Sequence, residues 1–307
     1  MRAIAYDRFG GPEVLQLVDL PEPPVGPDSV LVRTRASSVN PVDWKVREGY
    51  LQALFPHNFP IVPGWDVSGV VERVGAAVTE FAEGDEVVGY VRRDDVQWGT
   101  FAELVPAPVR TLAKAPTAGT GLVEAAGLPL AGLTALQSLR AAGVGKGDTV
   151  LVHAAAGGVG TFAVQLARIL GARVIGTAGE SSAQLVRDLG GEPVAYGDGL
   201  ADRVRELAGG PVDVALDFVG GEALEVSPEL VSDPGRVVSV IDPAVKDKGG
   251  RYVFVRPSSG DLAELVGYLE AGTLRVVVDE TFPLERAADA HRRSAEGHVH
   301  GKILVTV

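Results

Sequence analysis

The segment His153–Gly160, with the sequence HAAAGGVG, constrains the fold more than any other feature of the chain. It begins at the end of an apolar run, Thr149–His153, that is typical of a buried strand, and it opens a helical pattern over Val159–Leu170. Glycines at such a junction let the backbone approach a pyrophosphate, and the N–H groups that begin the helix attract the anion. The segment therefore predicts a dinucleotide site among alternating strands and helices.

The glycine pattern is matched at two of its three positions. Against G-x-G-x-x-G, Ala155 stands at the first position, and Gly157 and Gly160 stand at the second and third. A glycine-rich turn that serves packing alone is the alternative interpretation. The candidate cofactor contacts of this segment are Ala155, Gly157, Gly158, Val159 and Gly160.

The end of the next expected strand, Arg173–Thr177, bears on which nicotinamide cofactor is bound. Folds that select NADH usually carry an acid about 20 residues after the glycines, where it binds the ribose 2′-hydroxyl. No acid stands at this strand end, which favours NADPH, although Glu180 follows closely and leaves NADH as the alternative. Thr177 is a cofactor candidate, and the candidate phosphate contacts are Ser181, Ser182 and Tyr196, each of which could instead be a solvated loop residue.

Two kinds of residue pattern, one after the other along the chain, predict two domains. Residues 1 to about 120 consist of short β-branched runs broken by Gly and Pro, which predicts a β-rich barrel or sandwich. From residue 121 to about 256, runs of strand length alternate with helical patterns, which predicts an α/β domain with a parallel sheet. Residues 257–307 continue with helical and strand patterns, and composition leaves open which domain they join.

Composition excludes several classes of function. The formal net charge of −12 and the scattered basic residues argue against a nucleic-acid or anionic-membrane partner. The chain has no cysteine, which excludes disulfides, thiolate-bound zinc and a cysteine nucleophile. No apolar run approaches the ~20 residues of a membrane span, so no membrane partner and, by default, a cytoplasmic location are expected.

Seven motifs in order along the chain resemble those of the medium-chain dehydrogenase/reductase superfamily, and in particular its zinc-free quinone oxidoreductase (zeta-crystallin-like) branch. One such motif would carry little weight, but seven in register indicate the family over essentially the whole length. They are the glycine segment already described and the residue ranges 40–43, 63–69, 132–136, 217–221, 235–238 and 297–302.

The resemblance implies a GroES-like catalytic domain over residues 1–120, completed by residues 257–307. It also implies an inserted Rossmann domain over residues 121–256 that binds NADPH. Family members commonly pair through the edge of the Rossmann sheet, so a homodimer is expected. The apolar run Tyr252–Val255 is the edge strand expected to make this contact, because an unpaired strand edge invites pairing.

Zinc-binding members of the superfamily use Cys and His ligands that this chain lacks. The first ligand position falls at Asn40-Pro41, and Trp65 replaces the histidine of the family's Gly-His-Glu motif. The chain is therefore expected to bind no metal. Without a Lewis acid, hydride addition to an enone or quinone is easier than reduction of a simple ketone, because the negative charge is delocalised and needs only hydrogen-bond donors.

The resemblance also assigns candidate catalytic residues. Asn40 matches the family's asparagine that faces nicotinamide and substrate, and its amide could donate to a substrate carbonyl; a turn-forming Asn before proline is the alternative. Asp43 is expected to orient the loop rather than to act as a base. Lys45 could assist an oxyanion, with a solvated lysine as the alternative. Tyr50 is a candidate proton donor, and water is the other.

Further cofactor contacts follow from the same resemblance. Thr134 matches the threonine that binds the nicotinamide carboxamide. Lys302 matches the lysine of the terminal Gly-Lys motif, for which a cofactor-side role and a structural role are both open. Backbone groups at the ends of two further strands are expected to touch nicotinamide and ribose, namely those of Phe218, Val219, Val240 and Ile241.

These observations predict an NADPH-dependent oxidoreductase that transfers hydride to a small hydrophobic quinone or α,β-unsaturated carbonyl compound. Two alternatives stay open. The chain could bind nucleotide as a redox sensor or structural protein without turnover, although Asn40 and Thr134 favour an enzyme because a sensor needs only the glycine segment. It could also be a pathway-specific enoyl reductase, which shares the chemistry and differs in substrate.

Overall fold

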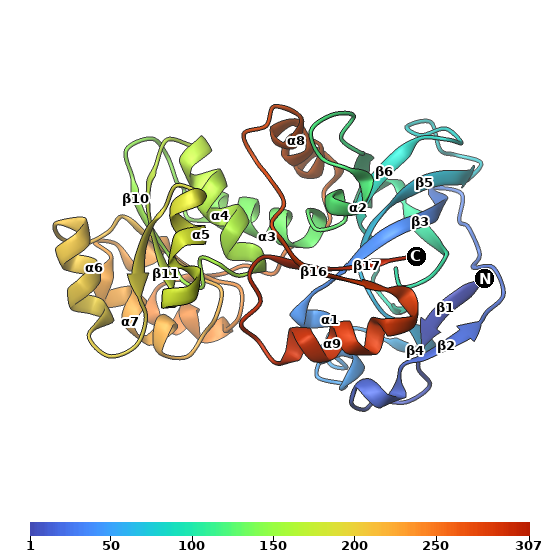
Figure 1. Cartoon of the computed structure of the whole chain (residues 1–307), viewed down its shortest axis with the longest axis horizontal. Helices are drawn as coiled ribbons and strands as arrows, with labels where there is room; N and C mark the ends of the chain where they lie inside the picture. The colour runs from blue at the N-terminus through green and yellow to red at the C-terminus, as the bar shows by residue number, and fades with distance from the viewer. The chain divides into compact units, whose positions relative to one another are not determined.

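The computed structural model describes all residues from Met1 to Val307, which divide into two units. Unit 1 consists of Met1–Leu130 and Pro257–Val307, and unit 2 consists of Ala131–Arg256. Both chain ends therefore belong to unit 1, where Figure 1 marks them. The C-terminal segment, whose domain the composition left open, joins the N-terminal one.

Unit 1 is built on a mixed sheet in which the last strands of the chain pair with an early one. Strand β17 runs antiparallel to β3, and β16 runs parallel to β17 (Figure 1). The order across the sheet is β16 (Val278–Pro283), β17 (Lys302–Thr306), β3 (Ser29–Val39), β5 (Asp66–Val74), β6 (Glu86–Tyr90) and β9 (Leu112–Lys114), and β8 (Leu104–Pro108) also pairs with β3. Two smaller sheets pair β1 (Arg2–Ala5) with β2 (Gln16–Asp19) and β4 (His57–Val62) with β7 (Val96–Trp98).

The valine-rich runs of unit 1 form these strands because alternate side chains can be buried together. Val30 and Val32 of β3 share a fully buried cluster with Val67 and Val71 of β5 and Val87 of β6. Residues two apart on a strand point to the same face, so one face of the sheet closes over a common core. The sequence predicts a β-rich domain here, and the strand pairing confirms it.

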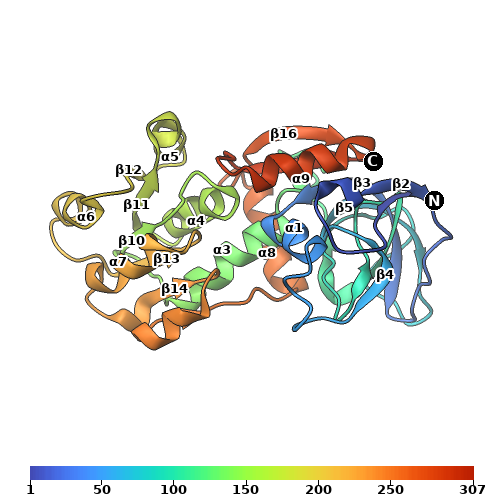
Figure 2. The ribbon, with the colours of Figure 1, turned by 90° about the horizontal axis from the view of Figure 1, so that it is seen from below.

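Four α-helices complete unit 1, and two of them have clear starting signals. Helix α1 (Pro41–Arg47) begins with proline after the extended residue Asn40, a position where the missing N–H of proline costs nothing. Helix α8 (Ser259–Glu270) begins where Ser258 Oγ accepts the Asp261 N–H. The others are α2 (Leu122–Ala125) and α9 (Ala287–Ala295); α9 lies beside β16 in both Figures 1 and 2.

Unit 2 is a six-stranded sheet in which every neighbouring pair is parallel. The order is β12 (Glu192–Ala195), β11 (Arg173–Ala178), β10 (Thr149–Val152), β13 (Val214–Asp217), β14 (Val237–Ser239) and β15 (Arg251–Tyr252). The first strand in sequence, β10, is central, and the chain winds outward from it on both sides. Ligands of such sheets bind where the winding reverses, beyond the carboxyl ends of β10 and β13.

Helices cover both faces of this sheet, as a buried parallel sheet requires. Leu151 and Ile175 of the strands pack with Val204 of α6 (Leu200–Ala208) and Leu224 of α7 (Glu222–Leu230). Gly176, which points to the other face, lies against Val186 of α5 (Ala183–Asp188). The remaining helices are α3 (Pro129–Ala141) and α4 (Gly158–Ile169). The predicted α/β class is confirmed.

The edge strand of unit 2 is shorter than the sequence predicts. The run Tyr252–Val255 was expected to be a strand, but β15 ends at Tyr252. Val253 still donates its N–H to the Ser239 carbonyl oxygen at 3.0 Å, after which the chain leaves the sheet.

No helix of the chain combines the length and the apolar character that crossing a membrane requires.

Candidate cofactor loop and buried polar cluster

The glycine segment connects β10 to α4 and is tied to the tip of the neighbouring strand β11. The Ala154 N–H donates to Thr177 Oγ1 (2.9 Å), and the Ala155 N–H donates to the Thr177 carbonyl oxygen (3.0 Å). Thr177 is buried near the end of β11. This predicted cofactor residue therefore fixes the shape of the loop through two hydrogen bonds.

Gly160 allows α4 to begin directly against the loop. A Cβ at this position would lie 2.1 Å from the Ala154 carbonyl oxygen and 2.8 Å from the Ala155 carbonyl carbon. Both are backbone atoms, so a side-chain movement could not make room. Ala154 has a φ of 54°, a left-handed conformation that costs an L-residue about 1–2 kcal/mol. Backbone packing thus imposes the form of the loop.

The alanine at the first position of the glycine pattern is accommodated by a glycine on the next strand. Ala155 is fully buried, and its Cβ faces Gly176 of β11. A Cβ added at Gly176 would lie only 2.6 Å from the Cβ of Ala155. The strand therefore supplies the room that a glycine in the loop would otherwise supply.

The first turn of α4 presents backbone N–H groups with no capping side chain. Its N-cap is Gly157. The first N–H of the helix that makes a hydrogen bond is that of Thr161, which donates to the Gly157 carbonyl oxygen (2.9 Å). The preceding N–H groups belong to Gly158, Val159 and Gly160, of which the first two residues are only half-buried. Free donors and the positive end of the helix dipole fit a pyrophosphate, so the residues present fit the predicted dinucleotide.

Two further loops at the carboxyl edge of the sheet are fixed by one buried carboxylate. Asp217, the last residue of β13, accepts through Oδ1 from the N–H groups of Val219 (3.0 Å) and Gly220 (2.7 Å). Its Oδ2 accepts from Ser239 Oγ (2.7 Å), which itself accepts from the Ile241 N–H (3.2 Å). These two loops contain the predicted nicotinamide and ribose contacts, which are Phe218, Val219, Val240 and Ile241. Val219 and Ile241 are exposed.

The residues expected around the ribose phosphate lie in the loops after β11 and β12. Ser181 is exposed, whereas Ser182 is buried and donates from Oγ to the Gly179 carbonyl oxygen (3.2 Å). Tyr196 is exposed, and a Cβ at Gly179 would lie 3.5 Å from its hydroxyl oxygen. Arg203 donates to backbone carbonyl oxygens of the Tyr196 loop at 2.7–3.4 Å, so this arginine holds the loop in place.

In unit 1, buried polar side chains meet around Asn40. Lys302, the first residue of β17, donates from Nζ to Asn40 Oδ1 (2.5 Å), and Asn40 Nδ2 donates to Asp66 Oδ2 (2.9 Å). Ser38 Oγ donates to the same Asp66 oxygen (2.6 Å), and the Asn40 backbone N–H donates to Asp43 Oδ2 (2.7 Å). None of these residues is more than 3 % exposed. We call Ser38, Asn40, Asp43, Asp66 and Lys302 the Asn40 cluster.

Burial shifts the ionisation of all three charged members of the Asn40 cluster toward their neutral forms. It raises the pKa of Asp43 to about 7, against the opposing effects of the Asn40 N–H and the Lys302 ammonium. It also raises the pKa of Asp66, although Lys302 and the hydrogen bonds from Ser38 and Asn40 oppose this. It lowers the pKa of Lys302, whose positive charge the two carboxylates favour.

The cluster contains some of the predicted site residues and not others. Asn40 and Asp43 belong to it, and so does Lys302, which was predicted as a cofactor contact. Lys45 does not: it is half-buried on α1, with Nζ 5.5 Å from the centroid of the Trp44 ring. Tyr50 is 70 % exposed in the turn after α1. The lysine that contacts Asn40 is thus Lys302, from the far end of the chain.

The other predicted cofactor residue, Thr134, is buried within α3.

Two acids that organise these sites were not predicted from the sequence. Asp66 and Asp217 each stand where an apolar strand begins or ends, inside the motifs 63–69 and 217–221. A carboxylate next to a buried run must find hydrogen-bond donors, and that signal could have identified both. The two serines that donate to them, Ser38 and Ser239, carry no such signal, because a serine within a strand is commonplace.

No group of three or more His, Cys, Asp or Glu side chains is arranged to hold a metal ion. Trp65, at the position where zinc-binding relatives carry histidine, is buried between aromatic rings, with its ring centroid 6.1 Å from that of Tyr90 and 6.0 Å from that of Phe55. The absence of zinc stays a prediction.

Comparison with known proteins gives matches along almost the whole chain. Residues 26–117 match the family model of the alcohol dehydrogenase GroES-like domain, and residues 189–305 match that of the zinc-binding dehydrogenases. The chloroplast envelope quinone oxidoreductase homolog of Arabidopsis thaliana is 34 % identical, over 99 % of this chain and 98 % of its own. The chloroplastic NADPH-dependent alkenal/one oxidoreductase of the same plant is 36 % identical, over 99 % of this chain and 79 % of its own. A mycobacterial protein solved in complex with NADPH has a TM-score of 0.85 and 32 % identity, with full coverage of both chains.

Proposed function

Because this chain belongs to the quinone oxidoreductase branch of the medium-chain dehydrogenase/reductase superfamily, we propose that it is an NADPH-dependent reductase. Its substrate is a small hydrophobic quinone or α,β-unsaturated carbonyl compound, and the reaction uses no zinc. The observation that carries the proposal is the loop of Ala154–Gly160, held rigid against Thr177 and opening onto the uncapped start of α4.

The loop residues have separate roles in holding the dinucleotide. The N–H groups of Gly158, Val159 and Gly160 bind the pyrophosphate, because they lack partners within the helix. The loops fixed by Asp217 offer backbone groups toward the nicotinamide and its ribose, together with the buried Thr134. When bound, the reduced nicotinamide supplies the hydride.

The choice of NADPH over NADH depends on the end of β11. The strand ends at Ala178 without a carboxylate that would repel a 2′-phosphate. Ser181, Ser182 and Tyr196 surround the position after this strand end, and Tyr196 is held there by Arg203 through the backbone of its loop. The name of the alkenal/one oxidoreductase relative, which specifies NADPH, supports the same choice.

On the substrate side, the Asn40 amide is the hydrogen-bond donor for the carbonyl oxygen that becomes negative. Nδ2 of Asn40 donates to Asp66 Oδ2 at 2.9 Å and also, at the limit of hydrogen-bond length, to the Ser38 carbonyl oxygen at 3.5 Å. The second of these bonds is weak, so an N–H of Asn40 can exchange it for a bond to a substrate oxygen. A preformed donor in a site with little water stabilises an enolate or hydroquinone anion strongly.

Two alternatives share parts of this site. A redox sensor or structural protein would use the glycine loop alone, and it would leave the Asn40 cluster without a role. A pathway-specific enoyl reductase would use both sites, and it would differ only in the substrate. The Asn40 cluster therefore favours an enzyme over a sensor.

The experiment that tests the proposal measures NADPH oxidation with a panel of acceptors. The panel contains 1,4-benzoquinone, 9,10-phenanthrenequinone and several enals and enones, and NADH is run in parallel. We expect turnover of at least one acceptor class and a lower KM for NADPH than for NADH. Binding of NADPH without turnover of any acceptor would contradict the proposal and favour the sensor.

Two further features belong to the same proposal. The chain forms a homodimer, for which the edge of the unit 2 sheet beyond β15 offers unpaired backbone groups. Sedimentation of the pure protein checks this directly. A cytoplasmic location stays a prediction, since the names of the two plant relatives refer to the chloroplast.

A further inference from the structure

The side-chain amide of Asn40 is held at both ends by ionisable groups from distant parts of the chain. Its oxygen accepts from Nζ of Lys302 on β17, and its nitrogen donates to Oδ2 of Asp66 on β5. Lys302 Nζ lies 3.9 Å from the same Asp66 oxygen, so the two charges are close but not in direct hydrogen-bond contact. The amide of Asn40 bridges them.

This bridge fixes which way the amide faces. A lysine ammonium can only donate hydrogen bonds, and an ionised carboxylate can only accept them. If the amide of Asn40 were turned over, its N–H groups would face the Lys302 ammonium and its oxygen would face Asp66. Both contacts would be repulsive, so a single orientation is left, with Nδ2 directed away from Lys302.

We propose that Lys302 and Asp66 are positioning residues that hold the Asn40 amide with its second N–H directed to the substrate oxygen. The inference rests on the proposed function and deepens it, because it names what makes Asn40 a directed donor. An asparagine free to rotate would present its oxygen to the substrate half of the time, and oxygen would repel the developing negative charge.

The rest of the cluster is arranged to keep this bridge rigid. Asp66 is fully buried, and its carboxylate accepts three hydrogen bonds. The donors are Asn40 Nδ2, Ser38 Oγ and the Leu130 N–H (2.8 Å). Gly127 packs close to the Lys302 stem, since a Cβ there would lie 3.3 Å from Lys302 Cγ. A buried ion pair gives little stability compared with apolar packing, so stability alone does not account for this one, whereas orientation of Asn40 does.

The chemistry of the neighbouring groups agrees with this role. The charged groups that face Lys302 are Asp66 of β5 and Asp43 in the first turn of α1, and both favour the ammonium form. The Lys302 ammonium at the amide oxygen draws electron density away from the amide nitrogen, which strengthens the N–H groups of Asn40 as donors.

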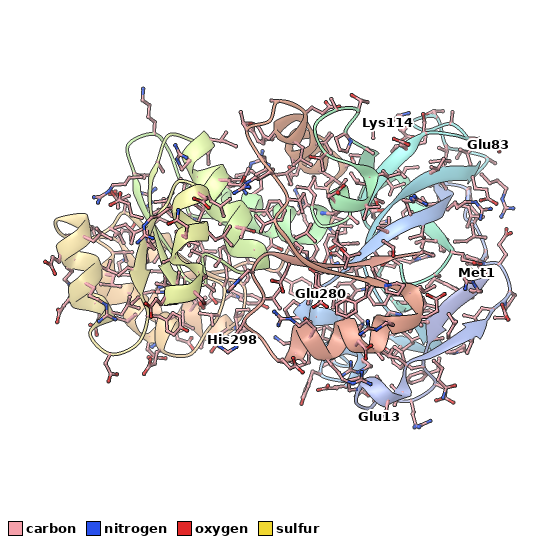
Figure 3. The ribbon with its side chains drawn as sticks, viewed as in Figure 1. Met1, Glu13, Glu83, Lys114, Glu280 and His298 are labelled. Carbon is pink, nitrogen blue, oxygen red and sulfur yellow. The ribbon has the colours of Figure 1, made fainter.

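The test compares Lys302→Met, which removes the charge and the donors at similar length, with Lys302→Arg, which keeps both. Lys114→Met is the matched control. Lys114 lies on β9, the last strand in the sheet order, and its side chain is at the surface (Figure 3). It pairs there with Asp85. We expect Lys302→Met to lower kcat for an enone about 100-fold, as loss of substrate orientation does. The dissociation constant for NADPH should change less than about threefold, and Lys302→Arg should recover at least a tenth of wild-type kcat.

A second readout reports the orientation itself and needs neither turnover nor a variant. The side-chain N–H protons of Asn40, assigned through its own carbons by NMR, should show stronger nuclear Overhauser effects to the side chain of Ser38, which shares the Asp66 oxygen, than to the methylene protons next to Lys302 Nζ. The opposite order of these two effects would overturn the proposal, and so would full kcat in Lys302→Met. Because this measurement does not use the reaction, failure of the proposed function would leave it valid.

Discussion

The α-carbon of Gly160 lies so close to the carbonyl oxygen of Ala154 that a Cβ there would be 2.1 Å away from it. This contact joins the start of α4 to the loop that precedes it. The loop is in turn joined to β11 by the hydrogen bonds to Thr177. Strand, loop and helix start are thus joined by direct contacts, so the unpartnered N–H groups of the helix start have their direction before any ligand arrives.

Replacing Gly160 by alanine should separate the helix from the loop. We expect the free energy of unfolding to fall by about 1–3 kcal/mol, the usual cost of overpacking, and NADPH affinity to fall at least about tenfold because the N–H groups lose their common direction. Urea unfolding and fluorescence titration measure the two effects. Gly267→Ala, in α8 with nothing within 4 Å of the new Cβ, is the control and should unfold no more easily than wild type. Wild-type affinity in Gly160→Ala would show that the loop does not bind the cofactor.

Replacing Thr177 by valine should weaken the loop from the other side. The Ala154 N–H then has no acceptor, and an unsatisfied donor of this kind costs about 1–3 kcal/mol. Thr177→Ser keeps the hydroxyl and is the matched control. We expect the valine variant, but not the serine variant, to lose stability in urea and to bind NADPH more weakly. Equal behaviour of the two variants would mean that the hydroxyl has no role in shaping the loop.

The sequence predicts the cofactor loop more completely than it predicts the Asn40 cluster. The cofactor loop lies within one stretch of chain, and its strand, glycines and helix could be recognised because each is a local pattern. Thr177 was placed near the cofactor, but its hydrogen bonds to the loop follow from the pairing of β10 with β11. The compensation between Ala155 and Gly176 depends on the same pairing and has no local signature.

The Asn40 cluster could be predicted only in part, because its members are far apart in the sequence. Asn40 and Asp43 stand in one motif, but Lys302 reaches them through the antiparallel pairing of β17 with β3. Lys45 is closer in sequence and was therefore predicted as the assisting lysine, yet it lies beside Trp44 on α1. Proximity along a chain does not indicate which lysine a sheet brings to an asparagine.

The buried carboxyl group of Asp43 predicts a pH dependence of stability. Its pKa is raised to about 7, so between about pH 4 and 7 the folded state holds a proton that the unfolded state has released. Stability from this group is therefore present at low pH and is lost as the pH rises through 7. Asp43→Asn keeps an acceptor for the Asn40 N–H and cannot ionise. We expect the drop in urea midpoint from pH 5 to pH 8 to be smaller in this variant than in wild type.

Asp85→Asn is the control for this pH effect. Its carboxyl group is near the surface, and hydrogen bonds from Lys114 and the Ala82 N–H lower its pKa, so it changes stability only in acid. The difference between pH 5 and pH 8 should match wild type in Asp85→Asn. An unchanged difference in Asp43→Asn would contradict the assignment.

Metal removal should have no effect on the reaction. The donor sets that hold zinc in dehydrogenases are lacking, since the chain has no cysteine and Trp65 fills the histidine position. We expect dialysis against EDTA to leave kcat and KM unchanged and elemental analysis to find less than a stoichiometric amount of zinc. Loss of activity on dialysis, with recovery on adding zinc, would refute the zinc-free mechanism.

The most direct test of the central claim follows a labelled hydride into the product. NADPH deuterated at one or the other face of nicotinamide C4 is supplied with an enone that the protein reduces, and the product is examined by mass spectrometry and NMR. An enone is used because a hydrogen delivered to carbon does not exchange with water. We predict that one of the two labelled cofactors transfers its deuterium to the β-carbon of the enone in every turnover. A reduced product without deuterium from either cofactor would contradict direct hydride transfer.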